Sequence, residues 1–166
     1  MREIKPKMQI IRGLPGSGKT TLAIEKFPFL MRVETDMFFY RNGAYRFTME
    51  NNRQSVRWFL SEVCTLCKQG MDFVLTGVFA AHTERLPSVI GTALQYGYEV
   101  WIKTLTTNYR SIHGVPKEHL DLMKASFMTE KELKRTLGGN KSIHYGIMSG
   151  NYPLAHLHLS EMKGKR

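Results

Sequence analysis

The chain has 166 residues, of which 42% are hydrophobic and 23% charged, and this is the composition of one globular domain with a full hydrophobic core. It contains no apolar run long enough to span a bilayer and no apolar signal core near Met1. We therefore expect a cytoplasmic protein with no membrane partner, acting in the host cytoplasm if the source is a phage or another virus. The net charge of +10 favours an anionic partner larger than a nucleotide, with nucleic acid as the first candidate, although a generally basic protein would carry the same charge.

The first half of the chain alternates short apolar runs with segments of helical periodicity. The pattern predicts strands at 7–12 and 29–34 and helices at 20–27 and 50–68. Pro28 ends the first helix, and Gly70 is a natural end for the second. Between them, the Asn42-Gly43 pair predicts a tight turn or a small hairpin in an aromatic segment.

The second half of the chain continues the alternation. It predicts strands at 72–76, 98–103 and 154–159, helices at 83–96, 116–126 and 129–137, and a Gly-, Asn- and Ser-rich loop at 138–151. Strands that alternate with helices indicate a single α/β domain over 1–166, with a parallel sheet covered by helices on both faces.

The segment GLPGSGKT at 13–20 satisfies the phosphate-loop pattern GxxxxGK[ST], and it lies between an expected strand and an expected helix. Glycines let successive backbone N–H groups turn toward phosphate oxygens, and the following helix points its positive end at the same place. We therefore predict binding of ATP with Mg²⁺, with Lys19 at the β- and γ-phosphates and the Thr20 hydroxyl on the metal. The residues expected to contact the nucleotide are Gly13, Leu14, Pro15, Gly16, Ser17, Gly18, Lys19, Thr20 and Thr21.

The three aspartates limit the choice of a catalytic acid or base. Asp36 closes the second expected strand, at the sheet edge where ligands bind in open α/β folds, so it could accept the proton of an attacking hydroxyl. It could equally cap the turn that follows the strand. Asp72 precedes its strand and Asp121 falls within a helix, so both are poorer candidates. The third strand ends in Thr76-Gly77, where mechanical ATPases carry a metal-binding Asp.

Basic and aromatic residues follow Asp36 directly. Arg41 and Arg46 flank the aromatic turn, and Arg53 and Arg57 lie one helical turn apart beside Trp58. Such interleaving suits a nucleic-acid strand through phosphate pairing and base stacking, so we list these four arginines as substrate-binding candidates. A solvated helix face with a core tryptophan is the alternative interpretation.

Two further pairs of residues are weak candidates for metal sites. Cys64 and Cys67 share a helical face without a second cysteine pair, which favours core thiols over a zinc site. His156 and His158 share a strand face, but two histidines without a third ligand are a weak metal signal.

Three motifs in order, namely GLPGSGKT, ETDMFF followed by RNGAYRF, and YRSIHGVP, resemble the polynucleotide-kinase-like P-loop kinases. This group includes the kinase domain of phage polynucleotide 5′-kinase and the Nedd4-binding-protein-type ATP-binding domain, and the likeness covers roughly residues 8–125. The resemblance implies an adenylate-kinase-like core of four or five parallel strands and Asp36 as general base. It also implies that Arg110, with His113 nearby, belongs to a phosphate-contacting lid around 107–126. Ser111 is a mild departure from the family's pattern.

One departure concerns the acceptor. The related proteins usually have Asp-Thr-Asn after the third strand, where this chain has Thr76-Gly77-Val78-Phe79. We expect an ATP-dependent phosphotransferase acting on a hydroxyl of nucleic acid, with DNA as the first choice. The hydroxyl could be a 5′ end or a hydroxymethylated base. A small-molecule or nucleoside kinase and a non-catalytic ATP-responsive nucleic-acid-binding module remain alternatives.

Overall fold

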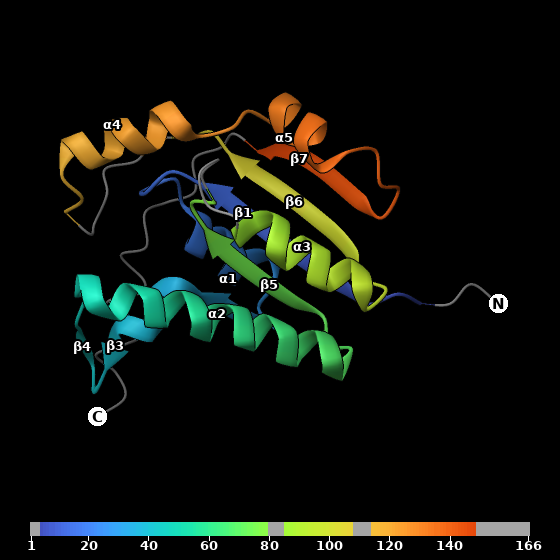
Figure 1. The fold of residues 1–166 in the computed structure, drawn as a ribbon, viewed down its shortest axis with the longest axis horizontal. Coiled ribbons are helices and arrows are strands. Elements are labelled where there is room, and N and C mark those ends of the chain that lie inside the picture. The colour runs from blue at the N-terminus through green and yellow to red at the C-terminus, as the bar shows by residue number, and fades with distance from the viewer. Residues whose placement is uncertain (1–3, 80–84, 108–113, 149–166) are drawn as a thin grey trace.

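Five parallel strands form the centre of the protein, in a computed structural model that describes residues 4–79, 85–107 and 114–148. The strands follow the order β2-β5-β1-β6-β7 across the sheet (Figure 1). Their bounds are β1 (Lys7–Gly13), β2 (Met31–Glu34), β5 (Phe73–Gly77), β6 (Glu99–Leu105) and β7 (Ile143–Met148). The expected parallel α/β architecture is confirmed.

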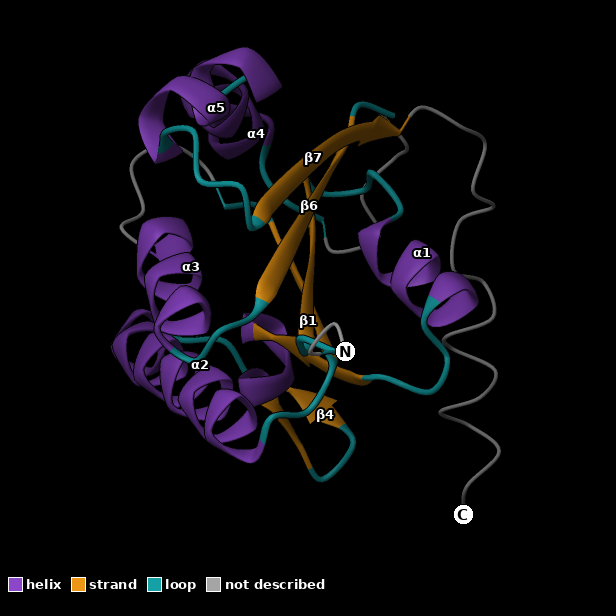
Figure 2. Ribbon diagram, turned by 90° about the vertical axis from the view of Figure 1, so that its right-hand side faces the viewer, coloured by secondary structure: helices purple, strands orange, loops and turns teal. Residues whose placement is uncertain are grey.

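Helices cover both faces of this sheet and make three layers (Figure 2). One face is covered by α1 (Lys19–Lys26), and the other by α2 (Met49–Gln69) and α3 (Arg85–Gln95). Two later helices, α4 (Lys117–Ser126) and α5 (Glu130–Leu137), lie beyond α3 near β6 and β7. None of the helices in these described ranges is long and apolar enough to cross a membrane.

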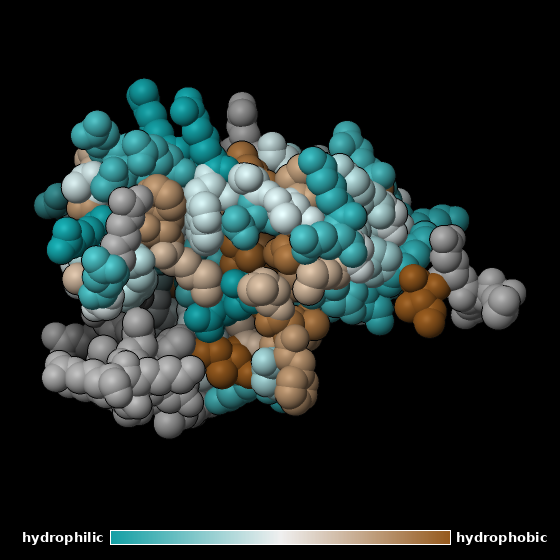
Figure 3. Space-filling model, turned by 90° about the horizontal axis from the view of Figure 1, so that it is seen from below, coloured by the Kyte–Doolittle hydropathy of each residue, from teal (hydrophilic) through white to brown (hydrophobic). Residues whose placement is uncertain are grey.

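The central strand β1 shows why the chain folds in this way. All of its residues after Lys7 are buried, as a parallel strand covered on both faces requires. On the face of α2 and α3 its side chains join a large core with Phe59, Phe73 and Ile102. On the face of α1 they join a smaller one that includes Leu22. On the side seen from below in Figure 3, hydrophilic side chains cover most of the surface and hydrophobic ones gather near its middle.

Local signals account for the expected helix end and hairpin. The Thr48 side chain caps α2 by accepting a hydrogen bond from the Asn51 backbone N–H at 3.1 Å, and Gly70 ends the helix at a φ of 65°. Asn42 and Gly43 both have positive φ, which is the geometry of a two-residue hairpin turn. They join β3 (Tyr40–Arg41) to β4 (Ala44–Tyr45).

The strand expected at 29–34 is shorter than predicted. Pro28 opens a turn in which the Leu30 N–H donates to the Phe27 carbonyl, so β2 begins only at Met31 and Phe29 is exposed. A short 3₁₀ helix, η1 (Thr35–Phe39), follows β2 and contains Asp36.

The expected loop at 138–151 is wrong, because it contains β7. This strand pairs with β6 in register, from Val100 with Ile143 to Leu105 with Met148. Ile143 is buried in the larger core, and Tyr145 packs against it. The glycines and serines of this segment are typical of a loop, so the sequence did not indicate a strand. Pairing with β6 stabilises it. The strand expected at 154–159 lies outside the described residues.

We predict that Tyr98→Phe lowers the free energy of unfolding by about 1–3 kcal/mol, as measured by urea titration. Tyr98 is 1% exposed, and its hydroxyl donates to the carbonyls of Leu66 at 3.1 Å and Met71 at 2.8 Å. Both carbonyls would lose this donor. The control is Tyr96→Phe at an exposed position, and equal stability of the two variants would contradict the prediction.

Candidate active site

The segment 13–20 turns from the carboxyl end of β1 into α1, as the motif predicts. Gly16 and Gly18 have φ values of 78° and 87°, which a residue with a Cβ rarely adopts. Gly18 is also the N-cap of α1, so the first free N–H groups of that helix lie at the loop. The conformation therefore presents backbone donors at a helix N-terminus, which is an arrangement that binds anions.

Gly13 is required for a different reason. A Cβ at this position would lie 2.4 Å from Ser17 Oγ and 3.2 Å from Leu105 Cβ. Ser17 is buried and its N–H donates to the Leu14 carbonyl at 3.1 Å, so the loop closes tightly on its own first residue. The first glycine of the motif thus permits a close approach within the loop.

The amino group of Lys19 is held inside this loop. Its Nζ donates to the Leu14 carbonyl at 2.9 Å. Burial lowers the pKa of Lys19 to about 8, while the charges of Glu34 and Asp36 act in the opposite direction. A buried ammonium with one carbonyl partner would gain further stabilisation from a phosphate anion.

Glu34 is a site residue that the sequence interpretation missed. Its Oε2 accepts hydrogen bonds from Thr20 Oγ1 at 3.2 Å and from Thr76 Oγ1 at 2.5 Å. Strand register places it there, because Glu34 lies beside Thr76 in the β2–β5 pair. The sequence did indicate that the strand now seen as β5 lacks an acid at its end. Only the pairing of β5 with β2 shows that Glu34 lies beside that position.

The donor set around Thr20 suits a magnesium ion. A hydroxyl and a carboxylate are hard oxygen ligands, and Mg²⁺ usually takes few protein ligands besides water and phosphate. The Thr20 hydroxyl could provide one such oxygen, with the Glu34 carboxylate beside it, so the metal role expected for Thr20 stays a prediction. Among the described residues, no three His, Cys, Asp or Glu side chains gather as a separate metal cluster.

Asp36 lies in η1, directly after β2, where it influences the charges of the loop. Its carboxylate favours the protonated form of Lys19, whose pKa burial lowers. The pKa values of Tyr40 and Tyr45 are raised first by burial and then by the charge of Asp36. Asp36 is therefore electrostatically coupled both to the phosphate loop and to the aromatic hairpin.

Arg85, the first residue of α3, is a second residue that the sequence interpretation did not single out. Its Nη1 donates to Thr35 Oγ1 at 3.4 Å, next to Asp36. Burial lowers the pKa of Arg85, and the charge of Asp36 acts in the opposite direction. A guanidinium thus stands beside the candidate base. Arg110 and His113, expected in the lid, lie outside the described residues.

The surface beside Asp36 is aromatic and basic. Tyr40, Tyr45 and Phe47 are 41%, 46% and 48% exposed, so their rings are half open to solvent. The Phe39 ring lies beneath the hairpin, with its centroid 5.0 Å from that of Phe47 and 5.8 Å from that of Tyr45. The hairpin therefore presents ring surface next to the candidate base.

The expected substrate arginines have different outcomes. The structure describes the side chains of Arg46, Arg53 and Arg57, which are exposed, but not that of Arg41. Trp58 packs against the core and against Phe38 of η1, with ring centroids 6.0 Å apart, so it does not offer a free stacking face. The arginines thus stay candidates, while Trp58 follows the core interpretation.

The remaining candidates occupy structural positions. Asp72 Oδ1 accepts the Lys7 backbone N–H at 2.7 Å, at the opposite edge of the sheet from the loop. Asp121 is exposed on α4. Cys64 and Cys67 are unbridged on α2, and burial raises the pKa of Cys67 to about 11, which makes it an unreactive core thiol.

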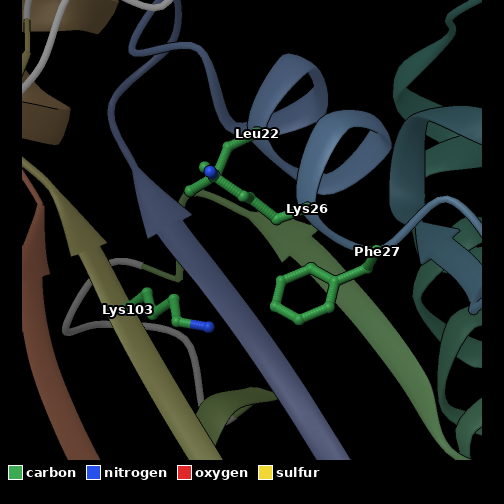
Figure 4. Close-up of a pocket in the computed structure, with 4 residues that line it drawn as sticks. All are labelled: Leu22, Lys26, Phe27 and Lys103. Carbon is green, nitrogen blue, oxygen red and sulfur yellow. The ribbon is translucent and has the colours of Figure 1, made fainter.

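A hollow of about 310 Å³ lies on the α1 face of the sheet, lined by Leu22, Lys26, Phe27 and Lys103. Lys103 extends from β6 toward the Phe27 ring (Figure 4), with its Nζ 4.4 Å from the ring centroid. The same Nζ donates to Gln9 Oε1 at 3.1 Å. The amino group is thus already paired, and none of the lining residues is an acid or a nucleophile.

Comparison with curated proteins gives distant relatives. No model of a known protein family matches the chain. An uncharacterised protein of Pasteurella multocida (strain Pm70) is 29% identical over 122 residues, which are 64% of this chain and 68% of that protein. NEDD4-binding protein 2 of Homo sapiens is 25% identical over 126 residues, which are 69% of this chain but only 7% of that protein.

Comparison with solved structures identifies the fold. A chain of the Pnkp1/Rnl/Hen1 RNA repair complex superposes with a TM-score of 0.53 at 19% identity, over 84% of this chain and 42% of that chain. A candidate kinase from Chloroflexus aurantiacus superposes with a TM-score of 0.53 at 15% identity, over 96% of this chain and 93% of that one. Together with the parallel sheet and the loop before α1, these likenesses show an α/β P-loop fold.

We predict that Gly13→Ala weakens binding of a nucleoside triphosphate. The added methyl group would push Ser17 outward at a cost of roughly 1–3 kcal/mol, or about 5- to 150-fold in affinity. Affinity for a fluorescent ATP analogue measures the effect.

Gly91→Ala is the matched control for that substitution. Gly91 lies within α3 and no described atom lies within 4 Å of an added Cβ, so this variant should gain roughly 0.5–1 kcal/mol in stability and bind normally. Normal binding by the Gly13 variant would contradict the proposed role of the tight loop.

We also predict that triphosphate binding takes up a fraction of a proton near pH 8.5. The free protein has a Lys19 pKa of about 8, and a bound anion would raise it, so some neutral Lys19 must become charged. Affinity should accordingly fall as the pH rises above 8. Calorimetry in two buffers of different ionisation enthalpy measures the uptake, and Lys26→Met should leave it unchanged. Equal binding enthalpies in the two buffers would contradict the prediction.

Proposed function

We propose that this chain is an ATP-dependent kinase that transfers the γ-phosphate to a hydroxyl group on nucleic acid. The observation that carries the proposal is the position of Asp36 directly after β2, close enough to the phosphate loop for its charge to act on the buried amino group of Lys19. An acid and a phosphate-binding cation that act on one another across a sheet edge are the two halves of a phosphoryl-transfer site.

The nucleotide half rests on the loop and on Thr20. Backbone N–H groups at 13–20 and the N-terminus of α1 would bind the phosphates, and Lys19 would exchange the Leu14 carbonyl for phosphate oxygens. Thr20 would hold Mg²⁺, which when bound neutralises charge on the β- and γ-phosphates.

The acceptor half rests on Asp36. Its carboxylate would accept the proton of the acceptor hydroxyl while that oxygen bonds to the γ-phosphorus and the bond to the departing ADP breaks. Arg85 stands beside Asp36, and its positive charge attracts the carboxylate.

A lid around 107–126 would close over the nucleotide and bring Arg110 to the γ-phosphate. None of the residues of α4, all of which the structure describes, is buried, so this helix is held weakly to the body. Arg12 anchors the chain just after it, because its Nη2 donates to the Met128 carbonyl at 2.7 Å and its guanidinium lies 4.1 Å from the Phe127 ring centroid. A loosely packed helix next to a fixed anchor suits a closing segment.

Nucleic acid is the preferred acceptor because of the surface next to Asp36. Half-exposed rings at Tyr40, Tyr45 and Phe47 suit base stacking. The exposed Arg46, Arg53 and Arg57, together with the net charge of +10, suit a phosphate backbone.

The acceptor hydroxyl is a 5′ end or a hydroxymethylated base. Both are candidates because the segment after β5 differs from that of the polynucleotide-kinase-like group. The Phe79 ring is buried against Phe59, and a Cβ at Gly77 would approach it to 2.8 Å. An aromatic residue thus stands in the segment where the polynucleotide-kinase-like group usually has Asp-Thr-Asn. The RNA repair complex among the similar structures adds RNA ends to the acceptors worth testing.

We predict that Asp36→Asn lowers phosphate transfer by roughly 10²–10⁴-fold and leaves ATP affinity nearly unchanged, because the amide cannot accept the proton. Incubation with γ-labelled ATP measures transfer to 5′-OH DNA, 5′-OH RNA, hydroxymethyl-base DNA and free nucleosides. Glu25→Gln, at an exposed position on α1 outside the proposed lid, should have full activity.

The outcomes of this assay separate the candidate functions. Label on a nucleic acid, with activity that falls steeply as salt is added, supports the proposal. Label on nucleosides alone would indicate a small-molecule kinase. ATP binding without transfer to any acceptor would indicate a binding module.

A further inference from the structure

Two threonine hydroxyls from different parts of the site donate to a single carboxylate oxygen. Thr20 belongs to the phosphate loop and Thr76 is the penultimate residue of β5, and both hydroxyls donate to Oε2 of Glu34. Thr76 is 1% exposed, so its proton is committed within the structure. The other oxygen, Oε1, lies 3.7 Å from Arg32 Nη2 and stays partly exposed with its side chain.

The direction of the Thr20 hydrogen bond matters for a metal ligand. A hydroxyl has one proton and two lone pairs, and a cation needs a lone pair. Because Thr20 donates its proton to Glu34, the lone pairs of Oγ1 remain available to a cation. Glu34 therefore orients the hydroxyl in the way that metal ligation requires.

The position of Glu34 explains a second peculiarity of the chain. P-loop proteins commonly hold the metal with an acid at the end of a second apolar strand, and here the corresponding strand, β5, ends in Thr76-Gly77. Glu34 occupies the neighbouring position on β2 and contacts Thr76 directly. The carboxylate is thus supplied from the adjacent strand, and Thr76 acts as its support.

We propose that Glu34 is the positioning carboxylate for the metal of the phosphate loop, acting through the Thr20 hydroxyl in place of an acid at the end of β5. This inference rests on the proposed function, because it assumes that the loop binds ATP with Mg²⁺. A purely structural ion pair with Arg32 would instead make Glu34 important for stability alone.

The test is the effect of Mg²⁺ on ATP affinity, measured by calorimetry with and without the metal. In the Glu34→Gln variant, the tightening that Mg²⁺ brings should shrink by roughly 10- to 100-fold, while affinity for metal-free ATP is kept or improved because a negative charge is gone. Glu25→Gln, at an exposed position on the same helix as Thr20, should behave as wild type.

Two further variants separate a positioning role from a structural one. Glu34→Asp keeps the charge with a shorter reach and should keep part of the effect of Mg²⁺. The double variant Glu34→Gln/Thr76→Asp returns an acid to the end of β5 and should recover metal dependence that Glu34→Gln lacks. Unfolding temperatures of all variants show that each comparison concerns folded protein.

The results distinguish this inference from the proposed function. Full Mg²⁺ dependence in Glu34→Gln, or no recovery in the double variant, would overturn the inference even if phosphate transfer is observed. Loss and recovery of metal dependence would support it even if none of the acceptors is phosphorylated. Wild-type protein that binds ATP equally well with and without Mg²⁺ would overturn both.

Discussion

The hydrogen bonds that join Thr20 and Thr76 to Glu34 connect three elements of the site at one point. They link the first turn of α1, the end of β5 and the end of β2. Asp36 follows Glu34 by two residues, so the candidate base lies close in the chain to this contact. A single carboxylate thus joins the start of α1 to the ends of β2 and β5, next to the candidate base.

The charge arrangement of the site suits the binding of an anion. The amino group of Lys19 is buried and its pKa is lowered, and Arg85 lies half-buried beside Thr35. The described acids that act on Lys19 are Glu34 and Asp36. Glu34 already accepts hydrogen bonds from the hydroxyls of Thr20 and Thr76. A triphosphate with its metal would bring negative charge to the cations and positive charge to the carboxylates. Binding would therefore stabilise the ionised forms of both kinds of side chain.

Much of the fold could be predicted from the sequence because its signals are local. Glycines with positive φ at 16, 18, 43 and 70 mark the loop, the hairpin and the end of α2. The strand β7 could not be predicted, since its glycine and serine neighbours are typical of a loop and its stability comes from pairing with β6. Asp36 could be proposed from the sequence because a strand end is a local feature, and its role as a base stays a prediction. Glu34 and Arg85 were missed, because their partners are 14 to 50 residues away in the chain.

The sequence by itself determined the phosphate loop, because GLPGSGKT carries its own backbone geometry and needs only a strand before it and a helix after it. It also determined the alternation of strands and helices that makes the sheet parallel. Only the tertiary structure decided which acid serves Thr20, because strand order and register are set by packing between distant segments. The order β2-β5-β1 brings Glu34 beside Thr76, and no spacing along the chain specifies that contact.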